Sequence, residues 1–223
     1  MKTIFLMVVL SVFVLAVACE RAPELPNDPQ ISIQNIQFRQ GGPSTDVDTL
    51  VLYLDFEDGN GDLGLSGSGI DFAPPYNPFN FVTDTNGDLI SIGSSDDLPE
   101  FNDRDWYIVR NTQGVPTDTV LIEQNPFHFN ILVDILERQP SGQYELYDFT
   151  AFQQVPGFYG RFPRLKEESE DRALVGTIRY AMQSRAWLLL FATDSLKLRV
   201  SIRDRALNQS NVVESQPFVL LNQ

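Results

Sequence analysis

Residues 196–203 read LKLRVSIR, a segment in which Leu196, Leu198, Val200 and Ile202 alternate with charged or hydroxyl side chains. Successive side chains of a β-strand point to opposite faces of the sheet, so this alternation predicts a strand with one apolar face and one polar face. Such a strand belongs to a sheet that is packed on one side and solvated on the other.

The same period of two recurs on both sides of this segment. Residues 127–136 alternate in the same way, and the turn-forming residues 138–142 separate them from 144–149, which predicts a β-hairpin. Residues 50–56 form another alternating strand. Residues 31–38 alternate with a slip in phase at Gln34 and Asn35, which predicts a β-bulge.

Further short apolar segments are strand candidates, namely 89–92, 106–110, 119–123, 174–182, 187–192 and 218–221. About ten short strands separated by turn residues are typical of an all-β, antiparallel sandwich or barrel, and they do not fit an α/β fold. Residues 164–174 are the one candidate helix, with a solvated loop as the alternative. Residues 66–81 predict a long loop rich in Gly, Pro and Asn.

The amino terminus has the pattern of a secretory signal peptide, with Lys2 before an apolar core and small residues after it. Ala16, Val17 and Ala18 precede the single cysteine, Cys19, and this segment resembles the lipoprotein box of bacteria. The resemblance implies cleavage before Cys19 and acylation of that residue, which would anchor the chain in a membrane. The alternative is an ordinary signal peptide or membrane anchor with an incidental cysteine.

We therefore expect a signal peptide at 1–18, a lipidated cysteine and Pro-rich tether at 19–30, and a single β-sandwich domain at 31–223. Prolines at 23, 26 and 29 favour an extended tether. Glu20, Glu24 and Asp28 resemble the surface-export signals of Bacteroidota lipoproteins. An outer-membrane location is expected, and the periplasmic and the surface leaflet both stay open.

Composition excludes several classes of function. The chain has 30 acidic and 16 basic residues and a net charge of −14, which argues against nucleic acid as a partner because phosphate binding needs clustered Lys and Arg. One cysteine cannot form an internal disulfide or a zinc site built on cysteines. One histidine cannot form a His-rich metal centre.

Three segments together resemble an uncharacterised group of Bacteroidota lipoproteins with an immunoglobulin-like β-sandwich. They are residues 55–65 (DFEDGNGDLGL), 157–165 (GFYGRFPRL) and 200–213 (VSIRDRALNQSNVV). The last segment is also similar to the final hairpin of many bacterial Ig-like domains, with Asp204, Asn208 and Ser210 at the matching positions and Leu207 where glycine is usual. The resemblance implies a fold and a location and carries no activity.

Asp58, Asn60 and Asp62 lie in a D-G-N-G-D segment that follows an alternating strand. Calcium prefers six to eight oxygen ligands, and a loop relaxed by glycines can turn such side chains onto one ion. The segment departs from the EF-hand pattern at Leu63 and Gly69, so a calcium site here would need ligands from elsewhere. The alternative is a tight hairpin turn at Asn60 and Gly61, with the acids exposed.

A second segment, D-T-N-G-D, repeats the pattern at Asp84, Asn86 and Asp88, and it is also an ordinary hairpin signal. Asp204, Asn208 and Asn211 are candidates for completing either loop. The sequence does not place them at the same end of the sandwich.

Residues for catalysis are few. A serine nucleophile would need His128 as its base, and no G-x-S-x-G segment is present. An acidic pair of the glycosidase kind is a third hypothesis, but no pair stands out. We therefore predict that the chain is not an enzyme.

Aromatic residues are the better indication of function. Tyr76, Trp106 and Tyr107 are candidates for a platform that stacks on sugars or for a protein-binding patch. Phe158 and Tyr159 with Arg161 form a second candidate cluster. For the first group the alternative is that Trp106 and Phe81 fill the core beneath the long loop. The second group is a candidate either for an interface or for a loop stabilised by cation–π contacts.

The sequence thus favours a non-catalytic lipoprotein of the cell envelope that binds another envelope protein, with calcium stiffening its loops. A carbohydrate-binding module of a glycan-uptake system is the second hypothesis. Coplanar, exposed rings would favour the glycan, and buried rings with a separate apolar patch would favour a protein.

Overall fold

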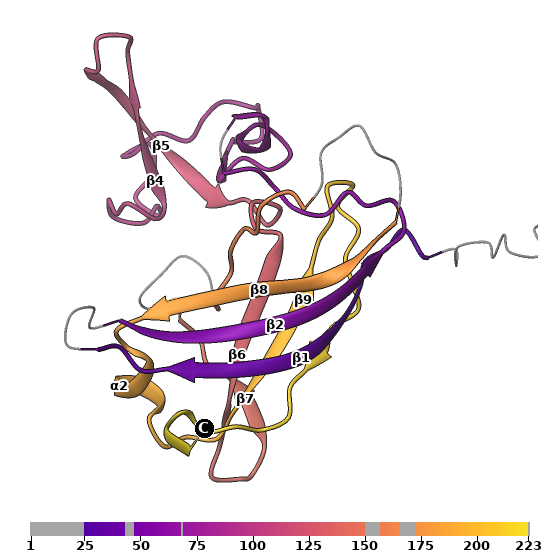
Figure 1. Cartoon of the computed structure of the whole chain (residues 1–223). Coiled ribbons are helices and arrows are strands. Elements are labelled where there is room, and N and C mark those ends of the chain that lie inside the picture. Colours follow the sequence, from indigo (N-terminus) through magenta and orange to yellow (C-terminus); the bar gives the residue numbers. More distant parts are fainter. Residues whose placement is uncertain (1–24, 43–46, 68, 150–156, 166–172, 223) are drawn as a thin grey trace, which may run out of the picture.

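The computed structural model describes residues 25–42, 47–67, 69–149, 157–165 and 173–222. Three antiparallel sheets dominate it, so the predicted all-β class is confirmed. In Figure 1 the strands of the first sheet cross in front of those of the second, and the third sheet lies to one side of this pair.

The first sheet has the strand order β1-β2-β8, with β1 at Gln30–Arg39, β2 at Asp48–Asp58 and β8 at Leu174–Ser184. The pairing of β1 with β2 shifts register between Ile33 and Asn35, which confirms the predicted bulge. Alternate residues of β2 are buried, as its sequence predicts.

The second sheet has the order β10-β9-β6-β7, with β6 at Ile131–Arg138, β7 at Tyr144–Leu146, β9 at Leu196–Ile202 and β10 at Val213–Glu214. β6 and β7 form the predicted hairpin. The expected start of β6 at residue 127 is wrong. The backbone amides of Phe127 and His128 bond to Asn125, which makes a turn, and the strand begins at Ile131.

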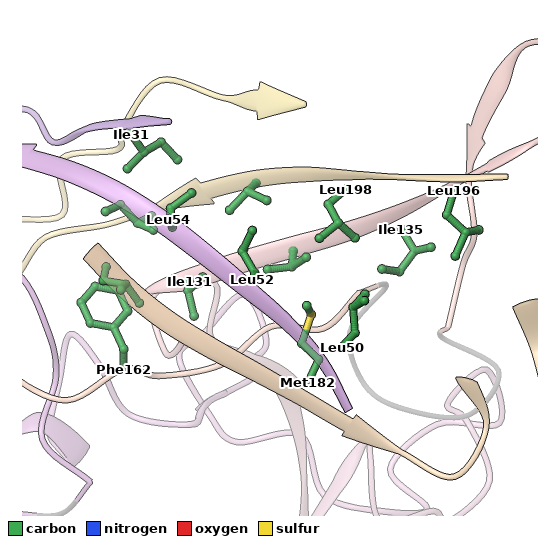
Figure 2. Packing of buried hydrophobic residues seen from close by; sticks show 14 of the residues in the cluster. Ile31, Leu50, Leu52, Leu54, Ile131, Ile135, Phe162, Met182, Leu196 and Leu198 are labelled. Atoms are coloured by element: carbon green, nitrogen blue, oxygen red, sulfur yellow. The ribbon is translucent and has the colours of Figure 1, made fainter. Parts of the chain in front are cut away.

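The hydrophobic core lies between these two sheets (Figure 2). Leu50, Leu52 and Leu54 of β2 face Ile131 and Ile135 of β6, and all five are fully buried. A fully buried side chain of this size contributes about 1.5–3 kcal/mol relative to an exposed one. This packing holds the ends of both sheets in fixed relative positions.

The third sheet has the order β3-β5-β4, with β3 at Phe79–Phe81, β4 at Trp106–Arg110 and β5 at Pro116–Gln124. We refer to residues 79–124 as the arm. Figure 1 shows β4 and β5 projecting away from the body of the molecule. The arm thus adds a third sheet to the two sheets that enclose the core.

Three expected strands have a different structure. Residues 187–192 contain a short helix, α2 (Trp187–Phe191), because a helical spacing of four residues buries both Trp187 and Phe191 while Leu189 is 84% exposed. Residues 218–221 make one bridge, from Phe218 to Leu196, before the 3₁₀ helix η2 (Leu220–Asn222). Residues 89–92 form isolated bridges only.

The long loop is partly structured, because it contains the 3₁₀ helix η1 (Gly69–Phe72) before β3. The expected signal peptide, Cys19 and most of the candidate helix at 164–174 lie outside the described residues. Among the residues that are described, no helix has the length and the apolar character needed to span a bilayer.

Candidate metal centre

Asp58 is the last residue of β2, and the chain turns immediately after it. Gly61 has a φ of 68°, which a glycine adopts without strain. The backbone amide of Gly59 donates to the carbonyl of Pro26 at 2.8 Å, so the residues before β1 pack on this turn. The turn directs Asp62 back toward the end of the sheet, where Leu63 bridges to Asp204.

Asp204 follows β9 and begins the turn that precedes β10. Its carboxylate accepts a hydrogen bond from the backbone amide of Asn208 at 2.8 Å and another from the Asn208 side-chain amide at 2.7 Å. Leu207 in this turn has a φ of 68°. The backbone amide of Arg205 donates to the carbonyl of Asp62 at 3.2 Å, which ties the two turns together.

Asp58, Asp62 and Asp204 form one cluster, in which one carboxylate oxygen of each lies within 4.8 Å of the others. Asp58 is fully buried and Asp204 is 2% exposed. Both carboxylate oxygens of Asp58 and one of Asp62 are buried without a hydrogen-bond partner, and so is the amide oxygen of Asn60. All four unpartnered atoms are acceptors, so what they lack is a donor or a cation.

Burial and mutual repulsion shift the acidity of this cluster. The pKa of Asp58 is raised to about 6, first by desolvation and then by the charges of Asp62 and Asp204. Desolvation also raises the pKa of Asp62, although the charge of Arg205 opposes that shift. Desolvation is the main reason that the pKa of Asp204 is raised as well. The cluster is therefore costly to ionise unless a positive charge joins it.

The donor set fits a hard divalent cation. Two oxygens that bind one calcium ion at about 2.3–2.6 Å lie at most about 5 Å apart, and the three carboxylates meet that condition. The three aspartates supply three of the six to eight oxygen ligands that calcium takes, and the unpartnered amide oxygen of Asn60, between Asp58 and Asp62 in the chain, is a candidate fourth. Zinc prefers nitrogen and sulfur ligands. Magnesium usually keeps several of its water ligands, and a site whose oxygens are buried has little space for them.

The second acidic segment is arranged differently. Asp84 accepts hydrogen bonds from the backbone amides of Asn86 and Asp88 at 2.8 and 2.9 Å, and these bonds lower its pKa. All three residues are exposed on the arm. Within the described ranges, Asp84 and Asp88 join no group of three potential ligands.

The first set of candidate binding aromatics is divided. Trp106 is 3% exposed, and its indole nitrogen donates to the carbonyl of Pro99 at 3.1 Å. Tyr76 is half-buried, and its hydroxyl donates to the carbonyl of Arg205 beside the acidic cluster. Tyr107 is 43% exposed and contacts the rings of Phe79 and Phe81.

The second set binds parts of the chain together. The Phe158 ring stacks on Trp187 with centroids 4.6 Å apart, and the Tyr159 hydroxyl donates to Asp134 at 2.9 Å. The Arg161 guanidinium donates to the carbonyls of Ser66 and Asp71 at 3.0 and 2.7 Å. It also lies 4.6 Å from the centre of the Phe72 ring and so fastens the long loop to the body.

Two contributors to the centre are not apparent from sequence patterns. The charge of Arg205 lowers the pKa of Asp62, and in the sequence only its position directly after Asp204 hints at this role. Pro26 supports the turn through Gly59, a contact that no sequence pattern predicts.

Comparisons with protein-family models, curated proteins and solved structures found no match to the chain.

Proposed function

We propose that this chain is a non-catalytic binding module of the cell envelope, a lipoprotein acylated at Cys19, and that a calcium ion at Asp58, Asp62 and Asp204 holds its loops. The observation that carries the calcium site is the complete burial of Asp58 with both carboxylate oxygens unpartnered. A buried, unpaired charge is strongly unfavourable, and a bound cation removes that cost.

The position of the cluster supports a structural role for the ion. It joins the turn after β2 to the turn after β9, and the Tyr76 hydroxyl attaches the long loop to the second of these turns. Calcium there would fix the long loop, which leads into the arm. The unpartnered oxygens of Asp58 and Asp62 are buried, which supports an enclosed ion over an acidic pair that must reach a substrate.

Thermal unfolding of the purified full-length chain tests the calcium site. Millimolar calcium should raise the melting temperature relative to chelator. At about a hundred times Kd the gain is about 2.7 kcal/mol, or roughly 5–10 °C for a chain of this size. Magnesium should raise it less, because it needs a regular octahedral site.

Two paired variants make the melting test specific. Asp58→Asn with Asp62→Asn should abolish the calcium shift. Asp84→Asn with Asp88→Asn removes the same two charges from the matching exposed segment and should leave the shift intact. A wild-type chain that melts at the same temperature with calcium and with chelator contradicts the proposal, as does a shift that survives in the first variant.

The envelope location rests on the segment around Cys19. A Cys19→Ser chain should leave the membrane fraction and appear in the soluble fraction, because the acyl chains are the proposed anchor. The wild-type chain should label with a radioactive fatty acid and the variant should not. A variant that still sediments with membranes contradicts the anchor and leaves the calcium site untouched.

The arrangement of the rings supports a protein partner over a glycan. Sugar platforms use exposed rings that lie in one plane. Phe79 and Phe81 are tilted by 40° and 66° to Tyr107, and Trp106 is buried.

We also propose that the two packed sheets form an immunoglobulin-like sandwich. Two packed antiparallel sheets and the turn at Asp204 and Asn208 support it, and an experimental structure would test it.

A further inference from the structure

One face of the arm gathers aromatic side chains. In the register of the third sheet, Tyr107 of β4 lies opposite Val120, and Phe81 of β3 lies opposite Ile122. Cross-strand partners point to the same side of a sheet, and so do residues two apart in one strand. Tyr107 and Phe81 therefore share one face above the buried Val120 and Ile122, and both remain more than 40% exposed.

These rings line a hollow. Its volume is about 580 Å³, and its lining comprises Pro74, Asn77, Pro78, Phe79, Asn80, Phe81 and Tyr107. Hollows of this size and apolar character are typical of sites that take a side chain or a small ligand. The rings of Phe79, Phe81 and Tyr107 contact each other at angles between 40° and 72°, so they surround a space and do not form a flat platform.

The charge of the arm indicates what the hollow takes. Residues 79–124 carry nine acidic side chains, against Arg104 and Arg110 as the basic ones. The Arg110 guanidinium donates to the carbonyl of Gly114, at the tip of the β4–β5 hairpin. Asp118 lies on the same face as Tyr107, whereas Glu123 pairs with Asn80 and lies on the opposite face of the sheet. Aromatic rings in an acidic field attract cations, above all the guanidinium group.

We propose that the aromatic hollow of the arm docks a basic side chain, arginine foremost, of a protein partner whose contacting surface is positively charged. This docking site shares one premise with the proposed function, namely that the chain acts by binding a partner. The guanidinium packs against Tyr107 and Phe81, while the acids of the arm steer the basic partner toward it. Four further apolar residues on the arm are exposed, namely Leu89, Ile92, Phe101 and Val115.

Fluorescence anisotropy on the full-length chain tests the proposal with a defined probe. The probe is a labelled peptide in which arginine alternates with leucine, and its counterpart has glutamate in place of arginine. At physiological salt the arginine peptide should bind and the glutamate peptide should not. Phe81→Ala with Tyr107→Ala should weaken binding about tenfold.

A matched variant controls for general loss of apolar surface. Val175 and Leu189 are 67% and 84% exposed and lie outside the arm, so Val175→Ala with Leu189→Ala should bind the peptide like the wild type. Equal binding by the Phe81/Tyr107 variant overturns the proposal, because the peptide would then follow the acidic charge alone. Binding of a glycan array with no binding of the arginine peptide also overturns it.

The Asp58/Asp62 variant separates this proposal from the calcium site. If it and the wild type show no calcium shift on melting but still bind the peptide, the calcium site fails and the docking site stands. If calcium stabilises the wild type and the peptide does not bind, the docking site fails and the calcium site stands.

Discussion

The carboxylates of Asp58, the last residue of β2, and Asp204, which follows β9 in the other sheet, approach each other within 4.8 Å in a buried position. Neither group has a basic side chain among the main influences on its pKa, and no well-formed hydrogen bond reaches the buried carboxylate oxygens of Asp58. The fold therefore holds together a set of like charges that oppose its own stability, which is typical of functional sites.

The first prediction concerns pH. The pKa of Asp58 is raised in the folded chain to about 6, above its ordinary value of 3.8, so the folded state holds a proton that the unfolded state has lost. Without calcium, the free energy of unfolding should therefore fall as pH rises from about 4 to above 6. Asp58→Asn should flatten this fall and make the metal-free chain more stable at neutral pH. Urea unfolding in chelator at several pH values measures both effects, and an unchanged slope in the variant would contradict the assignment.

The second prediction concerns Gly59. A Cβ atom there would lie 2.3 Å from the carbonyl oxygen of Leu25, and that contact is with backbone. Gly59→Ala should destabilise the chain by about 1–3 kcal/mol because the residues before β1 must move away. Gly67→Ala is the matched control, since a Cβ there meets nothing within 4 Å. Equal unfolding free energies for the two variants would show that the contact at Gly59 carries no weight.

The third prediction is that a substitution at Leu207 increases the stability of the fold. Its φ of 68° is a left-handed conformation that disfavours a residue with a Cβ. Leu207→Gly should raise the free energy of unfolding by about 1 kcal/mol, because glycine adopts this conformation freely. Gly61→Ala, at the same φ in the facing turn, should lower stability by a similar amount. Thermal melting of both variants measures the pair, and a loss of stability on Leu207→Gly would run against this account.

The fourth prediction concerns the ion pair between Arg164 and Asp71. The guanidinium donates to the two carboxylate oxygens at 2.6 and 2.9 Å, and Asp71 is 2% exposed. Hydrogen bonds from Arg164 hold the pKa of Asp71 well below its usual range. The pair therefore stabilises the chain at pH values above about 4, and that stability is lost as pH falls through the native pKa.

Arg164→Ala should cost about 3–5 kcal/mol at neutral pH, because it leaves Asp71 charged and buried. The double change Arg164→Ala with Asp71→Leu should recover part of the loss. Chemical unfolding of the three chains is the measurement. A single variant as stable as the wild type would mean that Asp71 is solvated once Arg164 is removed.

The local alternation of apolar and polar residues predicts much of the structure of the two sheets that enclose the core. The bulge in β1 and the hairpin of β6 with β7 appear where the residue pattern predicts them, because side-chain period and turn chemistry act over a few neighbouring residues. The helix at residues 187–192 is not predicted by this pattern, because a short apolar segment fits a strand and a buried helix equally well. Its place at the end of the sandwich, with Trp187 against Phe158, favours the helix.

The two acidic segments mark the limit of local information. Asp58 to Asp62 and Asp84 to Asp88 have nearly the same residues and both make turns. The first is enclosed by Asp204 and the residues before β1, and the second is exposed on the arm. The amino-acid sequence alone determines the oxygen donors and their spacing. Their desolvation raises the pKa of Asp58 and favours a bound cation. That desolvation depends on which distant segments pack over the turn, and only the tertiary structure decides this.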